Sequence, residues 1–186
     1  RLSYFLWSTM PDDELLALAG RGELRRNLRA QVDRMIRDPK AQAFVRNFTG
    51  QWLQARDVES VPINARVVLG PGARPNRDGR VEFDGAFRRL MRSETEAYFE
   101  HVLREDRSLL ELVDSDYAFL NARLAEHYGV TGVEGDELRK VTLPPDSPRG
   151  GVITQGTVLA VTSNPTRTSP VKRGVFILDN ILGTPP

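Results

Sequence analysis

Cysteine is missing from this sequence of 186 residues. Disulfide bonds, thiolate nucleophiles, cysteine zinc sites and covalent haem attachment through cysteine are therefore excluded within these residues. Both reducing and oxidising compartments tolerate a chain without cysteine, so this absence does not indicate where the protein resides.

Long apolar runs and a strong net charge are also missing. No run of about 18 apolar residues occurs, so no membrane span is expected. No basic segment followed by an apolar one opens the chain, so no signal peptide is expected. Its 26 basic and 25 acidic residues give a net charge of +1. The opening RLSYFLWSTM has the pattern of a helix already under way, and with the ending GTPP it suggests a piece of a longer polypeptide.

Histidine is scarce, and its placement argues against a metal site. His101 and His127 each follow a glutamate directly, and neighbours on a helix diverge by about 100°, so such a pair cannot share one ion alone. The Glu-x-x-His signature of di-iron proteins is absent. The loop Asn76-Arg-Asp-Gly79 would place Arg74 at the first ligand position of a calcium loop. No metal ligands are predicted.

Signatures of catalysis and of nucleic-acid binding are absent as well. There is no G-x-S-x-G elbow, and Gly70-Pro-Gly72 lacks the third glycine of a dinucleotide-binding loop. The cluster Arg25, Arg26 and Arg29 lacks interleaved aromatic residues, so no nucleic-acid partner is expected. No catalytic residue is predicted, and a chain without catalytic activity is the simpler interpretation.

Helical periodicity dominates what remains. Leu24, Leu28, Val32 and Ile36 recur every four residues, which predicts an amphipathic helix. Between about residues 56 and 82, glycine and proline recur every few residues and predict a long irregular loop. The fold class expected is therefore mainly α, a multi-helix bundle with that loop near 56–82 and at most one or two short strands.

Local signals place several helix ends. Pro11-Asp-Asp-Glu14 predicts a helix start, as does Asp84 before a helix that continues to Leu103. The stretch DYAFLNARLAEHYG predicts a helix that ends at Gly129. One strand can form within ELRKVTL, and two short helices are expected at about 148–162 and 170–182.

The stretch from Thr162 to Gly174, TSNPTRTSPVKRG, is unusually rich in hydroxyls and cations. Ser169 as an N-cap and Pro170 at the first helical position predict a helix start. Lys172 and Arg173 in that first turn oppose the helix dipole, each by a few tenths to about 1 kcal/mol. Three negative partners would offset this cost: carboxylates of the acidic segment Glu94–Asp116, a bound anion, or the propionates of a neighbouring haem.

Six residues are accordingly candidates for an anion-binding or haem-proximal site. They are Thr166, Arg167, Thr168, Ser169, Lys172 and Arg173. The alternative is purely structural, namely an ion-paired and hydroxyl-capped turn that joins two helices.

Long motifs also carry a family resemblance. RLSYFLWSTMPDDELLALA, NFTGQWL and ETEAYFEHVLREDRSLLELVDSDYAFLNARLAEHYGV resemble a planctomycete-type domain of unknown function, the PSD family. GGVITQGTVLAVTSNPTRTSPVKRGVFILDNILGTPP resembles the planctomycete cytochrome-c-like associated domain (PSCyt family) that follows it. The resemblance implies a helical domain at 1–130, a linker at 131–147 and a truncated two-helix segment of the following domain at 148–186.

The resemblance also implies a context, although it supplies no catalytic residues. Proteins of this type are large, exported and multidomain, so a periplasmic, cell-surface or extracellular location is expected. No cofactor is expected in this chain, and haem c is expected in a C-terminal segment beyond Pro186. The expected partners are neighbouring domains of the same polypeptide and proteins of a surface or redox assembly.

The function expected from this context is a non-catalytic helical module that supports an electron-transfer haem. Two alternatives stay open: a structural or adhesive module of a surface assembly, and an enzyme acting on an extracellular polymer. The last lacks support, because no carboxylate pair at catalytic spacing is apparent.

Overall fold

The computed structural model describes residues 1–64, 67–68 and 84–186. Its elements in chain order are α1 (Leu2–Trp7), α2 (Asp13–Gly20), α3 (Leu28–Arg37), η1 (Pro39–Ala41), α4 (Gln42–Trp52), η2 (Ala55–Glu59), α6 (Gly85–Arg104), η3 (Leu109–Leu112), β1 (Tyr117–Leu120), α7 (Ala122–Tyr128), β2 (Arg139–Thr142), η4 (Val152–Thr154), α8 (Gly156–Val161), α9 (Pro170–Phe176) and η5 (Ile177–Ile181). The mainly α class is confirmed. Most of the loop expected near 56–82 lies outside the described residues, and its first part forms η2.

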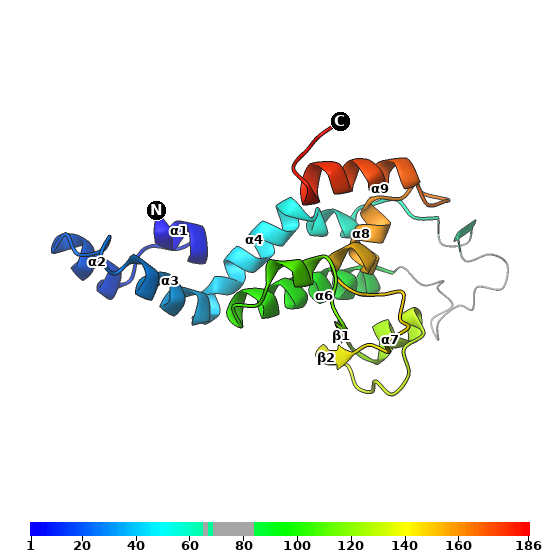
Figure 1. Ribbon diagram of the computed structural model, residues 1–186, viewed down its shortest axis with the longest axis horizontal. Helices are drawn as coiled ribbons and strands as arrows, with labels where there is room; N and C mark the ends of the chain where they lie inside the picture. Colours follow the sequence, from blue (N-terminus) through cyan, green and yellow to red (C-terminus); the bar gives the residue numbers. More distant parts are fainter. Residues whose placement is uncertain (65–66, 69–83) are drawn as a thin grey trace.

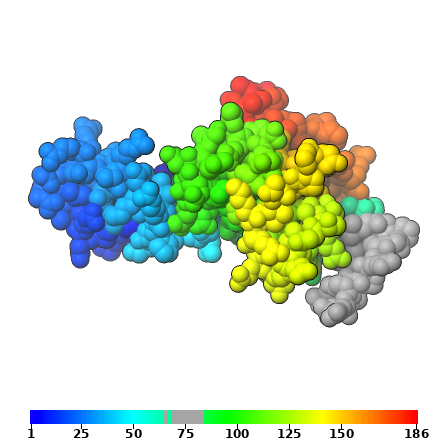
Figure 2. All heavy atoms as spheres, turned by 60° about the horizontal axis from the view of Figure 1, so that its bottom comes forward, coloured from blue at the N-terminus to red at the C-terminus, as the bar shows by residue number. Residues whose placement is uncertain are grey.

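The helices α1, α2 and α3 form one end of an elongated molecule (Figures 1 and 2). Trp7 is 2% exposed, and its indole nitrogen donates to the Met35 carbonyl at 2.9 Å. Asp12 caps α2 by accepting from the Leu15 amide, and it also pairs with Arg34 of α3 at 2.7 Å. The predicted start of α2 is therefore confirmed, and its cap residue also joins two helices.

The centre of the molecule is built on the long helix α6. Asp84 caps it by accepting from the Phe87 amide at 2.7 Å, as the sequence predicts. One apolar cluster contains Val45 of α4 and Tyr98 of α6 together with Val158 of α8 and Phe176 of α9. Residues before 130 and residues after 148 thus share one hydrophobic core, and burial of such side chains stabilises their association by about 1.5–3 kcal/mol each.

The expectation of one helix through DYAFLNARLAEHYG is wrong in its first half. Tyr117–Leu120 form strand β1, which pairs antiparallel with β2 in the register Tyr117 to Thr142. Asn121 then caps α7, because its side chain accepts from the Leu124 amide at 3.0 Å. The strand expected within ELRKVTL is confirmed as β2, and pairing with it decides the conformation of β1.

The expected helix at about 148–162 is also shorter than predicted. Gly151 has φ 68° and ψ 173°, a backbone conformation that is essentially restricted to glycine, and η4 follows it. Gln155 is extended, so α8 begins only at Gly156. A Cβ at residue 151 would overlap the Val113 carbonyl, so this glycine lets residues 150–152 pass close to residues 112–115. The second expected helix is found as α9 continued by the π-helical η5.

Candidate functional site

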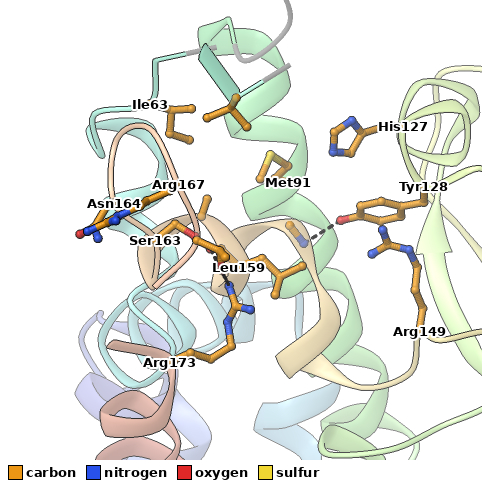
Figure 3. A pocket seen from close by; sticks show the side chains of 14 residues that line it. Ile63, Met91, His127, Tyr128, Arg149, Leu159, Ser163, Asn164, Arg167 and Arg173 are labelled. Atoms are coloured by element: carbon orange, nitrogen blue, oxygen red, sulfur yellow. Dashed lines mark hydrogen bonds between the residues drawn. The ribbon is translucent and has the colours of Figure 1, made fainter. Parts of the chain in front are cut away.

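A pocket of about 350 Å³ lies where α6, α7, α8 and α9 meet (Figure 3). Its apolar surface comes from Ile63, Met91, Leu159 and Ala160. Figure 3 shows Tyr128 and His127 on one side of this space and Ile63 on the other, with Met91 and Leu159 between them. The pocket is therefore assembled from segments that are far apart in the sequence.

Among the described residues, the lining of this pocket contains three arginines and no aspartate or glutamate. They are Arg149, Arg167 and Arg173. Within residues 1–64, 67–68 and 84–186, none of the three forms an ion pair, whereas other arginines such as Arg34 and Arg92 pair with carboxylates. The described lining thus carries three positive charges and no negative one.

Arg173 is fixed by neutral acceptors. Its guanidinium lies 3.3 Å from the Thr162 hydroxyl, 3.2 Å from the Thr168 hydroxyl and 3.5 Å from the Leu159 carbonyl. These contacts join α9 to the end of α8 and to the intervening turn. Hydrogen bonds from a charged donor contribute about 1.5–3 kcal/mol each at good geometry, and the long distances here place these at or below the lower end.

Arg149 is fixed on the other side of the pocket. Its guanidinium carbon lies 3.8 Å from the centroid of the Tyr128 ring, and one nitrogen donates to the Thr154 carbonyl at 3.0 Å. In Figure 3, Arg149 and Arg173 both point toward the space around Leu159, while Arg167 lies beside Asn164 at the far edge. Two of the three cations are thus held in place by the fold, and Arg167 is exposed at the rim.

The structure divides the six candidate residues into two groups. Arg167, Thr168 and Arg173 line the pocket, whereas Thr166, Ser169 and Lys172 are not among its lining residues. Ser169 caps α9 as predicted, because its hydroxyl accepts from the Lys172 amide at 3.4 Å. The Lys172 side chain is exposed to solvent. The cationic turn is therefore partly a helix cap and partly a pocket wall.

Carboxylates of the segment Glu94–Asp116 do not neutralise this turn in the part of the chain that the structure describes. Those of Glu96, Glu100 and Glu111 pair instead with Arg92, Arg104 and Arg107, each four residues away along the chain. The structural alternative expected an ion pair at this turn. In the structure, Arg173 joins the two helices through the hydroxyls of Thr162 and Thr168 instead.

A buried polar chain lies directly behind the pocket. The Tyr128 hydroxyl donates to the Glu94 carboxylate at 2.6 Å and accepts from the Gly156 amide at 2.8 Å. Glu94 is 1% exposed, and this burial raises the pKa of its carboxyl to about 8. Burial, with Glu94 as neighbour, raises the pKa of Tyr128 as well. Near pH 7 both groups are therefore mainly uncharged, and the arginines keep the dominant charge.

The sequence alone missed Arg149, His127 and Tyr128 as pocket residues. A weak signal existed for Arg149, because Ser147-Pro-Arg-Gly echoes Ser169-Pro-Val-Lys-Arg-Gly and each places an arginine shortly after Ser-Pro. No sequence signal brings His127 and Tyr128 to the same place, since they lie about 30 residues or more before the cationic turn.

The described residues of the pocket supply positive charge beside an apolar surface. Among the described residues, no three or more histidine, aspartate or glutamate side chains are grouped so that they could hold a metal ion. No helix in that part of the chain is both long and apolar enough to cross a bilayer. The chemistry available at the pocket is anion attraction by guanidinium groups beside an apolar surface.

We expect Arg173→Ala to lower the free energy of unfolding by about 1 kcal/mol, because it removes the contacts that join α9 to α8. Lys172→Ala removes the same charge from the same turn but no packing, so we expect a change within about 0.5 kcal/mol. Urea denaturation of both variants measures the difference. Equal stability of the two would show that the Arg173 contacts do not hold α9.

Glu94 predicts a pH dependence of stability. Because its folded pKa of about 8 exceeds the unfolded value of 4.5, its contribution is fully present below pH 4.5 and is lost as the pH rises toward 8. Between these values we expect the free energy of unfolding to fall by up to about 1.4 kcal/mol per pH unit on account of Glu94.

Denaturant titrations of Glu94→Gln from pH 5 to pH 8 isolate this effect, since the variant should lack that decline. Glu126→Gln, which replaces an exposed acid on α7, serves as the control and should keep it. The same pH profile in Glu94→Gln and the unchanged protein would refute the assignment.

Two family models match this chain. The family model PSD4, described as "Protein of unknown function (DUF1592)", matches residues 1–130, and PSCyt3, described as "Protein of unknown function (DUF1588)", matches residues 149–186. Neither the curated proteins nor the solved structures gave a significant match. The first model covers well over half of the chain, and the planctomycete-type domains occur in the expected order. The chain therefore belongs to the DUF1592 (PSD4) family, with a DUF1588 (PSCyt3) region following in its last 38 residues.

Proposed function

We propose that this chain is a non-catalytic helical module of an exported multidomain protein, and that it holds an adjoining haem-bearing, electron-transfer segment of the same polypeptide. The family order supports this proposal, as does the cytochrome-like name of the second family, PSCyt3. An exported module of this kind resides in the periplasm or at the cell surface.

The observation that carries the proposal is the core shared by the two family regions. Val152 and Val158 are at most 1% exposed and belong to the same apolar cluster as Val45 and Tyr98 of the first region. A region joined through a common core keeps a fixed orientation, unlike one tethered by a flexible linker. Whatever adjoins the C-terminal helix is thereby positioned relative to the whole module.

A second contact fixes that helix near its end. The indole nitrogen of Trp52 donates to the Asn180 carbonyl, and the Asn180 side-chain amide donates to the Trp52 carbonyl. These reciprocal hydrogen bonds join α4 to η5 across 128 residues of sequence. Figure 1 shows the chain leaving η5 away from the body of the molecule.

The residues present do not suit haem attachment within the chain itself. The sequence has no cysteine for thioether bonds, and the described residues contain no histidine-rich cluster. Arg167 and Lys172 are exposed and can form charge-assisted hydrogen bonds with carboxylates such as haem propionates. The contribution assigned to this chain is therefore support and electrostatic contact.

The natural full-length polypeptide, produced in a host that attaches c-type haem, tests the proposal. We expect haem absorbance bands and a reversible reduction midpoint. Trp52→Leu and Asn180→Ala should each shift that midpoint or weaken haem retention, because each loosens the support of η5. Gln51→Ala, on an exposed position of α4, is the control and should change neither.

Two results would contradict the proposal, each in a different part. Absence of haem from the full-length protein would contradict the proposed electron-transfer role. A haem whose midpoint and retention stay the same in Trp52→Leu and Asn180→Ala, with both variants folded by circular dichroism, would remove the supporting role.

A further inference from the structure

We infer that the pocket between α6, α7, α8 and α9 is a binding site for a small amphipathic anion, a molecule with an apolar body and a carboxylate or phosphate group. This site is inferred without reference to the proposed haem neighbour, although Arg167 at the rim is common to both proposals. It also differs from a helix N-terminus that attracts an anion, since its cations come from three separate segments.

The size of the pocket indicates a small molecule. Its volume of about 350 Å³ lies at the lower end of the range usual for ligand pockets, about 300–1,000 Å³. The pocket is partly open to solvent, and most of its described lining comes from α6, α7, α8, α9 and the turn between the last two. Ala160 is 8% exposed and Met91 1% exposed, so the apolar surface belongs to the protein core.

The charges indicate an anion. Arg149 and Arg173 direct guanidinium groups toward the apolar space, and Arg167 adds a third at the rim. In the described structure no carboxylate forms an ion pair with any of them; Glu94, behind the wall, accepts a hydrogen bond from the Tyr128 hydroxyl and interacts with Arg149 only at longer range. Guanidinium groups bind carboxylate and phosphate with paired hydrogen bonds, and a low-dielectric surround strengthens such bonds.

The apolar side chains that lie between the arginines indicate that the ligand has an apolar part. In Figure 3, Leu159 lies between Arg173 and Tyr128, and Met91 lies above it, between Ile63 and Tyr128. A bare inorganic ion would leave this surface without a partner, whereas an aryl or alkyl chain would cover it at about 25 cal/mol per Å² of apolar area removed from water. The ligand class is therefore an organic anion rather than a simple one.

Glycine at position 156 keeps the pocket in this form. A Cβ there would lie 2.8 Å from the Met91 methyl carbon and 2.9 Å from the Tyr128 hydroxyl. The close approach also lets the Gly156 amide donate to Tyr128, which holds the aromatic wall on which Arg149 lies. The wall and its cation are thus preorganised, which reduces the entropic cost of binding.

Paired ligands that differ only in charge test the inference. Aryl and alkyl carboxylates of four to ten carbons, for example 4-phenylbutyrate, are titrated beside their primary amides and beside inorganic phosphate. We expect at least one acid to bind about tenfold or more tightly than its amide and than phosphate, by calorimetry. Backbone amide NMR shifts should centre on Gly156 and Ala160.

Substitutions then identify the cations responsible. Arg167→Gln, Arg149→Met and Arg173→Met should each weaken binding of that acid by about three- to tenfold and leave the binding of its amide unchanged. Lys172→Gln removes a charge from the same turn outside the pocket and should change affinity by less than about twofold. Arg167 is exposed and forms no ion pair in the described structure, so its variant remains informative if the other two are unstable.

Several results would overturn the inference. Equal affinity for acid and amide throughout the series would show that the site does not select for a negative charge. Phosphate binding as tightly as the best acid would show that an apolar body is not needed. An effect of Lys172→Gln equal to that of Arg167→Gln would indicate attraction to general surface charge. Absence of binding at millimolar concentrations of every acid would refute the site itself.

Discussion

The close approach of Gly156 to α6 and α7 is the contact on which the rest of this structure depends. A Cβ at residue 156 would lie within 3 Å of the ends of the Met91 side chain of α6 and the Tyr128 side chain of α7, so a larger residue there would have to displace them. Through this contact α8 enters the core of the region before it in the sequence, and α9 follows. The same contact forms the floor and one wall of the pocket. The contact of Gly156 with α6 and α7 therefore contributes both to the packing of α8 and to the shape of the pocket.

The distribution of charge gives the pocket its character. Along α6 and its continuation, glutamates are paired with arginines one helical turn away, as in Arg92 with Glu96 and Arg104 with Glu100. These acids are consequently not available to the cationic turn. Glu94, the acid behind the pocket wall, is buried and mainly protonated at neutral pH. A positive pocket in a chain of net charge +1 results from this local pairing.

The sequence predicted well what depends on neighbouring residues. The caps Asp84 and Ser169 and the strand at Arg139–Thr142 are found where local patterns place them. It failed where distant residues decide the conformation. Tyr117–Leu120 carries a helical pattern but pairs with β2, and Gly151 interrupts a predicted helix because the chain must pass close to Val113.

The candidate site shows the same division. The importance of Arg173 was predictable from its place in the first turn of a capped helix, but its partners were not, since its hydroxyl acceptors depend on how the chain turns between α8 and α9. Of the three partners considered for this turn, the carboxylates of Glu94–Asp116 were suggested by composition, which does not show which acids are already paired with arginines. Tyr128 entered the site only through tertiary packing, which the spacing of residues does not reveal.

Native-state hydrogen exchange tests most directly whether the two family regions form one body. If they do, the slowest amides of α6 and α8 exchange through the same global opening, with equal free energies and equal dependence on denaturant. Amides of α8 that exchange at a much lower free energy than those of α6, with protection of α6 unaffected, would show two independent units and contradict the account.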